Sequence, residues 1–406
     1  MRSLVINRHS LTWTVGERGR HLPNAPAERY LITRTFAGGS TGLRPASFPH
    51  TAVIDMSDAD RLVATARWMI GTGRVEHVVA IHEKDMLLAA QLREEHGLGG
   101  ATVSETLNFR DKCRMKGALE AAGYTRLPRY RAVDPDALTA DWPWSGPTVV
   151  KSRWGVGASE VRIADSAAAV RLAVAELSAR GHELEIEEYV PGRMYHCDSV
   201  VVDGEVLFTA VCEYIANPGA FATGGVAGSV IVPDGPLRTA LLGENTTVLR
   251  MLGLTSGVTH VEFFHTPDGE LVFCEAAARP GGGGIDVIVE ELYGVDLIRA
   301  AIEIQHGVRP TLTARAAAPG AVTGIVGMYH CEHGDTPAAD IVRDLPGVLH
   351  YAFAAQEVAT GVVRHCTDYA HKTYLTAESR EQFDERAREV VAAVRATQDL
   401  ADREAG

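Results

Sequence analysis

The chain has little lysine and no closely spaced cysteines. Arginine supplies most of its 39 basic residues, so the position of each lysine becomes informative. The lysines are Lys84, Lys112, Lys116, Lys151 and Lys372. The six cysteines include no Cys-x-x-Cys pair. We therefore expect free, buried thiols in a cytoplasmic protein rather than a disulfide framework.

Long apolar runs and an excess of positive charge are also missing. No stretch of about 18 apolar residues offers a membrane span, and the start of the chain, Met1-Arg2-Ser3, lacks the apolar core of a signal peptide. The formal net charge is −13, whereas nucleic acids and anionic membrane surfaces attract basic proteins. We expect small-molecule partners, with neither a nucleic acid nor a membrane among them.

The length of the chain predicts several domains. At 406 residues it exceeds one ordinary hydrophobic core, and its 46% hydrophobic and 22% charged content is that of a globular protein. The predicted fold class is α/β and α+β, with several domains. Residues 1–105 are predicted as an N-terminal α/β domain, residues 106–309 as a central domain, and residues 310–406 as a C-terminal α+β domain.

Residues 1–105 alternate short apolar runs with helical stretches, as in an open α/β unit with a parallel sheet. Ser57, with Asp60 three residues later, resembles a capping box that would begin a helix over Ala59–Ile70. A second helix is expected over Glu83–Glu95. No Gly-x-Gly-x-x-Gly motif follows the first apolar run, so we expect no dinucleotide site there.

The C-terminal residues combine apolar runs with an amphipathic helix. Five apolar side chains recur at the spacing of one helix face. They are Phe383, Ala387, Val390, Val391 and Val394. The apolar runs before them, Val322–Met328 and Val348–Phe353, fit either the core of this segment or the interface of a homodimer.

The most informative segment is a predicted β-hairpin over His260–Ala277. Two apolar stretches flank a turn at Thr266–Gly269. Glu262 lies on the first strand and Glu275 near the end of the second, so the hairpin can place both carboxylates side by side. Such a pair is an oxygen-rich site for Mg²⁺. The alternative is two outward-facing acids on an exposed hairpin.

Arg279 and four glycines follow this hairpin directly. Four successive glycines cost backbone entropy and contribute no packing, which suits a place where the chain passes close to a ligand. The order of the residues therefore indicates a metal site at the two acids, then an anion site at Arg279, then close contact between the glycine backbone and a ligand. The glycines are Gly281, Gly282, Gly283 and Gly284.

Lys151 ends a predicted strand just before a glycine loop. The loop contains Gly155, Gly157 and Ser159, whose N–H and hydroxyl groups could contact phosphate oxygens. It is no Walker loop, because the Gly-Lys-Ser/Thr ending is absent. A plain hairpin turn remains the alternative. Lys112 lies on a predicted helix, where a lysine is ordinarily solvated.

The strand that ends in Pro191-Gly192 is a further candidate for contact with a nucleotide. Glu187, Glu188 and Val190 lie at this exposed crossing, which could offer backbone groups and a carboxylate to the edge of an adenine base. Two consecutive acids in a strand are otherwise a solvated edge.

Together these motifs resemble the ATP-grasp superfamily, in the order that the family shows and over the whole chain. The resemblance implies a pre-ATP-grasp domain, an ATP-grasp domain with a small lid at about residues 125–192, and the C-terminal domain. It implies that Lys112 and Lys151 hold the phosphates of ATP. Gly155, Gly157 and Ser159 would form the mobile loop over them. Glu187, Glu188 and Val190 would bind the adenine edge, and Glu262 and Glu275 would ligate two Mg²⁺ ions, for which Mn²⁺ could substitute.

Within the superfamily, Glu275 to Arg279 followed by glycines looks most like the L-amino-acid ligases, which form dipeptides. Many members carry an asparagine where this chain has Ala277, and its loss also occurs in the ligases. Many carry a glutamate for the ribose where this chain has Met194. Ribose contacts would then shift to His196 or Asp198, or weaken.

The resemblance implies an ATP-dependent carboxylate–amine ligase that forms an amide through an acylphosphate. Arg279 would stabilise the oxyanion, and Gly281, Gly282 and Gly283 would hold the substrate carboxylate. His260 could polarise the acylphosphate or relay a proton, although a structural histidine is equally consistent with the sequence.

Glu213 could bind a substrate ammonium, or lie in an ordinary surface loop. Three alternative functions remain: a carboxylase, for which a biotinyl Met-Lys-Met motif is missing, a purine-pathway-like ligase, and a non-catalytic nucleotide-binding protein.

Overall fold

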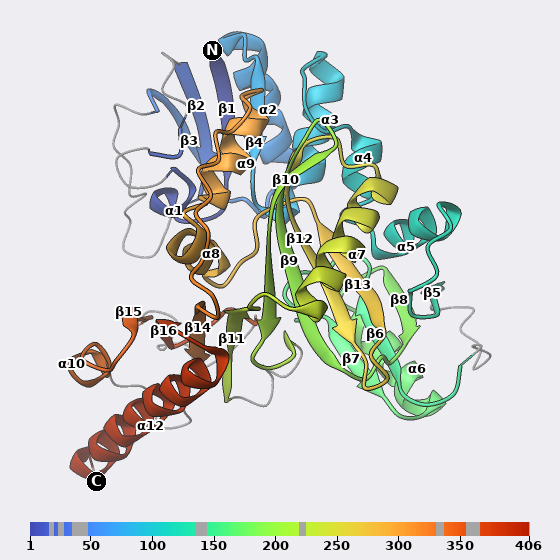
Figure 1. Cartoon of the computed structure of the whole chain (residues 1–406). Helices are drawn as coiled ribbons and strands as arrows, with labels where there is room; N and C mark the ends of the chain where they lie inside the picture. Colours follow the sequence, from blue (N-terminus) through green and yellow to red (C-terminus); the bar gives the residue numbers. More distant parts are fainter. Residues whose placement is uncertain are drawn as a thin grey trace.

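The computed structural model describes residues 1–15, 20–22, 28–34, 48–134, 144–218, 225–329, 337–354 and 366–405. These residues form a mixed α/β fold with two four-stranded sheets and one eight-stranded sheet (Figure 1). The mixed α/β class predicted from the sequence is confirmed. The division at residues 105 and 309 stays a prediction.

The N-terminal sheet is parallel throughout, as the alternation of strands and helices predicts. Helix α2 begins after Asp58, whose carboxylate accepts a hydrogen bond from the Arg61 amide. The prediction of Ser57 as the cap is therefore wrong; its hydroxyl donates to Asp55 instead. The strands, in spatial order, are β3 (His50–Val53), β2 (Glu28–Thr33), β1 (Arg2–Asn7) and β4 (His77–Ala80). The helices are α1 (Leu11–Val15), α2 (Ala59–Gly73), α3 (Glu83–His96) and α4 (Val103–Leu107).

A small antiparallel sheet follows helix α5 (Lys112–Ala121). Its strands lie within the stretch predicted as a lid. In spatial order they are β5 (Tyr130–Val133), β8 (Leu184–Glu188), β6 (Thr148–Ser152) and β7 (Val161–Ala164). Helix α6 (Ala167–Ser178) packs its apolar face on β6 and β8 through Val170, Val174 and Leu177, which are all buried. This sheet presents the predicted glycine loop, between β6 and β7, to the rest of the molecule.

The eight-stranded sheet is antiparallel and joins the central and C-terminal parts of the chain, because Val226 on β11 pairs with Met328 on β14. Its strands, in spatial order, are β13 (Leu271–Ala277), β12 (Gly257–His265), β9 (Arg193–Val202), β10 (Glu205–Tyr214), β11 (Val226–Ile231), β14 (Val322–Met328), β16 (His371–Ala377) and β15 (Val348–Phe353). The remaining helices are α7 (Pro236–Leu252), α8 (Ile285–Tyr293), α9 (Leu297–Gln305), α10 (Ala339–Val342) and α12 (Arg380–Ala405).

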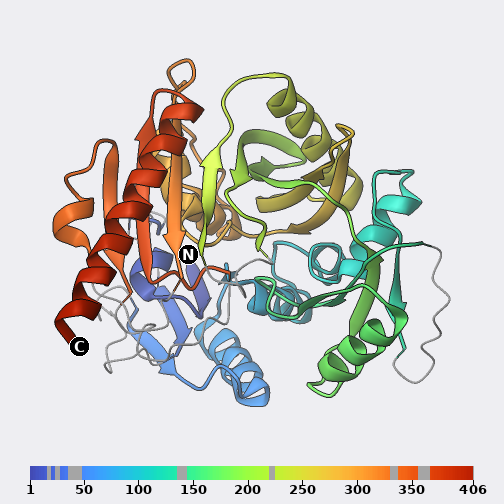
Figure 2. The same ribbon diagram turned by 90° about the horizontal axis from the view of Figure 1, so that it is seen from below.

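The C-terminal helix α12 uses the apolar face that the sequence predicts. Phe383, Val390 and Val394 are buried in a cluster with residues of β14 and β16. Figure 2 shows α12 and α6 on opposite sides of the molecule, with the large sheet between them. Among the described residues, no helix is long and apolar enough to cross a membrane. The five described cysteines are free thiols, and three of them, Cys197, Cys212 and Cys274, are buried.

Candidate active site

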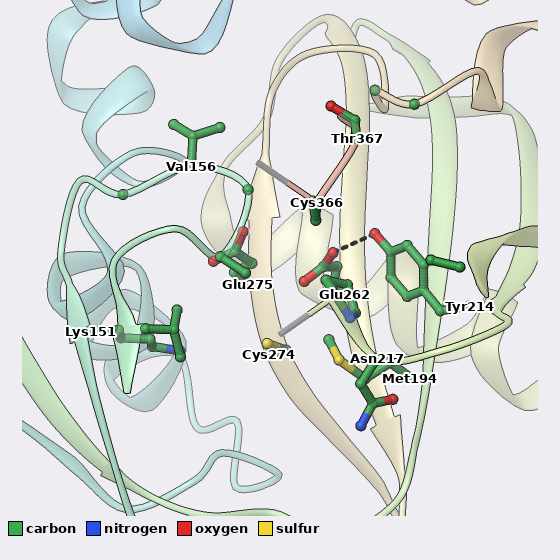
Figure 3. Close-up of a pocket in the computed structure, with 18 of the residues that line it drawn as sticks. Lys151, Val156, Met194, Tyr214, Asn217, Glu262, Cys274, Glu275, Cys366 and Thr367 are labelled. Carbon is green, nitrogen blue, oxygen red and sulfur yellow. Dashed lines mark hydrogen bonds between the residues drawn. The ribbon is translucent and has the colours of Figure 1, made fainter. Parts of the chain in front are cut away.

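A cavity lies where the β6–β7 loop, the β12–β13 hairpin and the segment after Cys366 meet. Figure 3 shows Lys151 on the side of the small sheet, with Glu262 and Glu275 on neighbouring strands facing it. Most of the residues that the sequence singles out line this cavity. They are Lys112, Lys151, Gly155, Gly157, Glu187, Glu188, Val190, His260, Glu262, Glu275, Arg279, Gly282 and Gly283.

The two predicted metal acids lie side by side. Glu262 and Glu275 are directly opposite partners in the β12–β13 register. Tyr214 donates its hydroxyl to Glu262 Oε1 at 2.6 Å, and Lys112 Nζ lies 3.0 Å from Glu275 Oε2. Burial would raise the pKa of Glu275, but the positive charges of Lys112 and Lys151 outweigh it and lower that pKa. Ionised carboxylate oxygens at a cavity wall fit Mg²⁺, which prefers such ligands.

Lys112 also closes the base of the glycine loop, where its ammonium donates to the Gly155 carbonyl at 2.9 Å. Gly157 adopts a left-handed φ of 68°, and its carbonyl accepts from the Cys366 amide at 3.3 Å. Ser159 does not line the cavity, since its hydroxyl donates to the Val156 carbonyl at 3.3 Å. The loop therefore reaches the C-terminal segment through its backbone.

Lys151 belongs to a buried cluster of four charges. Its ammonium lies 2.6 Å from Glu187 Oε1, and Lys116 bridges Glu185 and Glu187 at 2.6 and 2.9 Å. Burial would lower the pKa of each lysine, but Glu187 and Glu185 raise the pKa of both. In turn, the lysines overcome burial and lower the pKa of Glu187 to about 2. Lys151, Lys116 and Glu187 therefore all stay charged at neutral pH.

Lys116 and Glu185, which are both fully buried, are not among the site residues predicted from the sequence. Two signals were present. Lys116 lies four residues after Lys112, on the same face of α5, and Glu185 alternates with Glu187 on one face of β8.

The end of the cavity that the sequence predicts to receive adenine is apolar. Val149, Ile163, Met194 and Phe264 line it beside the crossing at Val190. Glu188 lies there as well, but its carboxylate is held by the backbone amide and guanidinium of Arg129, at 2.8 and 2.6 Å. Glu187 is held by the two lysines.

His196, predicted as a ribose contact, does not line the cavity. It is fully buried, and its ring nitrogens contact Asp198 Oδ2 at 2.6 Å and Ser229 Oγ at 3.0 Å. Burial lowers its pKa, against the pull of Asp198. Because both nitrogens already have protein partners, we correct the prediction and assign His196 no ribose contact.

Arg279 is anchored to the N-terminal part of the chain by a residue that the sequence did not single out. Its Nε and Nη2 donate to Glu83 Oε2 at 2.8 and 2.6 Å, and Arg110 pairs with the other oxygen of the same carboxylate. Burial would raise the pKa of Glu83, but the two guanidinium groups lower it to about 2. Glu83 begins helix α3, so a predicted helix start was the one available signal.

His260 is a buried cation between two carboxylates. Its Nδ1 lies 2.9 Å from Asp198 Oδ1 and its Nε2 lies 3.3 Å from Glu262 Oε1. Burial opposes protonation, but the charge of Asp198 and the bond to Glu262 raise the pKa of His260 to about 10. A histidine that keeps its proton through the neutral range is not suited to relaying a proton, and because both ring nitrogens of His260 have protein partners, it is suited to holding the Glu262 carboxylate in place.

The glycine run forms the start of helix α8, with Gly284 as its N-cap. A Cβ at Gly281 would lie 2.6 Å from Asp198 Oδ1 and 3.0 Å from His260 Nδ1, so only glycine fits there. Gly282 and Gly283 line the cavity, whereas Gly281, which the sequence also predicts to contact the substrate, does not. The helix start also favours a negative charge.

Glu213, predicted to hold a substrate ammonium, lies in a different cavity beside α12. Its carboxylate is paired with Arg193 at 2.6 Å and with Arg380. Two guanidinium groups already neutralise it, and we therefore correct this prediction.

Comparison with known proteins identifies relatives that are ligases or synthases of amino-acid compounds. No known family profile matches the chain. An L-arginine-specific L-amino acid ligase of Bacillus subtilis is 26% identical over 320 residues, which cover 75% of this chain and 76% of that protein. Carnosine synthase 1 of Gallus gallus is 26% identical over 218 residues, or 50% of this chain and 23% of that longer protein.

Solved structures share the fold along almost the entire chain. An L-amino acid ligase from Bacillus licheniformis superposes with a TM-score of 0.76 and 18% identity, over 97% of each chain. A carboxyaminoimidazole ribonucleotide synthase from Aspergillus clavatus, complexed with ATP, gives a TM-score of 0.68 at 14% identity, over 97% of this chain and 98% of that one. In sequence and in fold the chain is similar to L-amino acid ligases of the ATP-grasp superfamily, and the prediction of an ATP-dependent ligase that forms C–N bonds is confirmed.

Proposed function

We propose that this ligase joins an amino acid to a second amino acid or amine, through an acylphosphate, and releases ADP and phosphate. The observation that carries the proposal is the convergence of Lys112, Lys151 and Arg279 with the opposed carboxylates Glu262 and Glu275 on one cavity. Cations and paired acids in one place suit the transfer of a phosphoryl group, which is catalysed by positioning and charge stabilisation.

ATP would lie with its base in the apolar end of the cavity and its phosphates under the β6–β7 loop. Val149, Ile163, Met194 and Phe264 offer the apolar walls. Each lysine ammonium has three donors, so Lys112 and Lys151 can bind phosphate oxygens while they keep the carboxylates and carbonyl that hold them.

Glu262 and Glu275 would hold Mg²⁺, or Mn²⁺ in its place, which when bound neutralises the charge of the transferred phosphoryl group. Tyr214 and His260 both contact Glu262 Oε1. They would thereby fix the orientation of this carboxylate, in the manner of groups that surround metal ligands in general.

In the first step, a carboxylate oxygen of the acid substrate forms a bond to the γ-phosphorus, and the bond to the bridging oxygen of ADP breaks. Arg279 and the backbone N–H groups of Gly282 and Gly283 would hold the substrate carboxylate in line. In the second step, the amine attacks the acyl carbon and phosphate leaves. The same guanidinium and N–H groups would then stabilise the oxyanion, and loss of one such donor typically costs about 10²–10³ in rate.

The proposal is tested by mixing the protein with ATP, Mg²⁺ and pairs of L-amino acids and measuring ADP, phosphate and AMP. We expect ADP and phosphate in equal amounts, formed only when a competent pair is present. Arg279→Ala should lower this rate by about 10²–10³. If no pair in a broad panel raises ADP above the rate without amino acids, or if AMP is formed instead, the proposal is wrong.

A further inference from the structure

Three buried side chains lie in series beside the metal acids, and their hydrogen bonds have the pattern of a serine–histidine–aspartate triad. Ser229 Oγ contacts His196 Nε2 at 3.0 Å, and His196 Nδ1 contacts Asp198 Oδ2 at 2.6 Å. Asp198 and His196 are fully buried, and Ser229 is 3% exposed. Buried polar groups carry a desolvation cost; Asp198 also holds His260, whereas the side chains of His196 and Ser229 have each other among their partners.

The serine end of this series opens into the active-site cavity. Ser229 lines the same cavity as Glu262, Arg279 and Gly282. It is paired across the sheet with Tyr214, whose hydroxyl binds Glu262, and His196 is the register partner of Glu262 on the neighbouring strand. The hydroxyl of Ser229 therefore lies at the side of the cavity where the acylphosphate would form.

The direction of the hydrogen bonds follows from the acceptors. A carboxylate accepts only, so His196 Nδ1 carries a proton and donates it to Asp198. His196 Nε2 is then a free acceptor, and the Ser229 hydroxyl donates to it. This tautomer is the one that lets a serine hydroxyl pass a proton to a histidine.

Four carboxylates on the cavity wall are already engaged by other protein groups, and a fifth, Glu160, lies on the β6–β7 loop. Glu187 binds two lysines, Glu188 binds Arg129, and Glu275 binds Lys112. Glu262 accepts from Tyr214 and His260. Ser229 instead begins a path of two hydrogen bonds that leads away from the reacting atoms, through His196 to Asp198, whose other oxygen accepts from His260 Nδ1 at 2.9 Å.

We propose that Ser229, backed by His196 and Asp198, accepts the proton of the attacking amine in the amide-forming step. This inference rests on the ligase function proposed above. The amine nitrogen forms a bond to the acyl carbon, and the bond from that carbon to the phosphate oxygen breaks, with its electron pair leaving on phosphate. A nitrogen proton passes to Ser229 Oγ as the hydroxyl proton passes to His196 Nε2. The proton then returns through the hydroxyl to the departing phosphate, which leaves as hydrogen phosphate.

Hydroxylamine allows amide formation to be measured separately from the formation of the acylphosphate. It is a good nucleophile that is already unprotonated near neutral pH, so it captures an acylphosphate as a hydroxamate with little need of a base. An enzyme that lacks only the proton acceptor should therefore still form the hydroxamate from ATP and the acid substrate, while it forms the amide slowly.

The experiment measures hydroxamate and amide formation side by side for the wild-type chain, Ser229→Ala and His196→Gln. We expect both variants to form hydroxamate within about twofold of the wild type and amide about 10²–10⁴ times more slowly, the usual contribution of a general base. The ratio of the two rates within one preparation does not depend on the folded fraction, so partial misfolding leaves the result interpretable.

Ser199→Ala is the matched control. Ser199 is a fully buried serine of the same sheet, bonded to Thr209 and Asn245, and it does not line the cavity. Its amide-to-hydroxamate ratio should equal that of the wild type. The inference is overturned if Ser229→Ala keeps the wild-type ratio. A wild-type chain that forms no hydroxamate with any amino acid would instead refute the proposed function.

Discussion

At the scale of single residues, the site depends on charges that are buried together. Glu83 holds Arg279 and Arg110, and Glu187 holds Lys151 and Lys116. A buried charge without its partner costs several kcal/mol, so each carboxylate fixes the position of the cations around it. A residue of the N-terminal part therefore sets the orientation of Arg279, which under the proposed function would meet the substrate.

Glu83 makes a prediction about stability and pH. The pKa of its carboxyl falls from an ordinary 4.5 to about 2 in the folded chain. A lowered pKa stabilises the fold above the ordinary value, and this stability is lost as the pH falls through the folded value. We expect Glu83→Gln to lower the free energy of unfolding by about 3 kcal/mol near pH 7, with a difference from the wild type that shrinks between about pH 4.5 and pH 2.

Urea denaturation at a series of pH values measures this difference. The control is Asp268→Asn, an exposed acid in the turn of the β12–β13 hairpin, which should leave the free energy of unfolding within about 0.5 kcal/mol of the wild type. A constant difference between Glu83→Gln and the wild type over the whole acid range would refute this account of the carboxylate.

The residue types and order of the site could be predicted, but its buried partners could not. Lys112, Lys151, Glu262 and Glu275 all line the cavity. Glu83 and Arg279, in contrast, are 196 positions apart, and no local pattern brings them together. The partners of His196 and Glu213 include residues far along the chain, Ser229 on β11 and Arg380 on α12, and no local pattern shows these contacts.

At the scale of elements, the glycine run sets the start of α8 against the large sheet. Gly284 has a left-handed φ of 104°, and a Cβ there would lie 2.5 Å from the Tyr374 hydroxyl and 2.8 Å from Ile325 Cδ1. We expect Gly284→Ala to lower the free energy of unfolding by about 2–4 kcal/mol, from backbone strain together with overpacking. Denaturant titration measures the loss.

Gly282→Ala is the matched substitution within the same run. A Cβ at Gly282 meets nothing closer than Thr367 Cγ2 at 3.9 Å, and its φ is not in the left-handed region. It should cost under about 1 kcal/mol in stability. Equal losses in the free energy of unfolding for Gly284→Ala and Gly282→Ala would contradict this account, which requires the larger loss at Gly284.

Elements built from neighbouring residues could be predicted from the sequence. The β12–β13 hairpin, the glycine loop between β6 and β7, and the apolar face of α12 all have local signals in turns and periodicity. The cap of α2 was misplaced by one residue because Ser57 and Asp58 are both good caps. The pairing of β11 with β14 joins residues about 100 positions apart and has no such signal.

At the scale of the whole molecule, one continuous eight-stranded sheet carries the metal acids at one end and the C-terminal strands at the other. The N-terminal part contacts the site through the pair of Glu83 with Arg279, and the β6–β7 loop of the small sheet contacts it through the bond from Lys112 to Gly155. Figure 1 shows the N-terminal sheet and the small sheet beside the large one. Under the proposed function, the three parts would surround the reacting groups, an arrangement that suits an intermediate that must be protected from water. An acylphosphate is an intermediate of this kind.

The most direct test of the acylphosphate follows one oxygen atom. An amino acid labelled with oxygen-18 in its carboxylate is incubated with the protein, ATP, Mg²⁺ and a competent amine, and the released phosphate is analysed by mass. If the carboxylate attacks the γ-phosphorus, each phosphate formed carries one labelled oxygen from the acid. Amide formation with unlabelled phosphate would contradict the proposed mechanism.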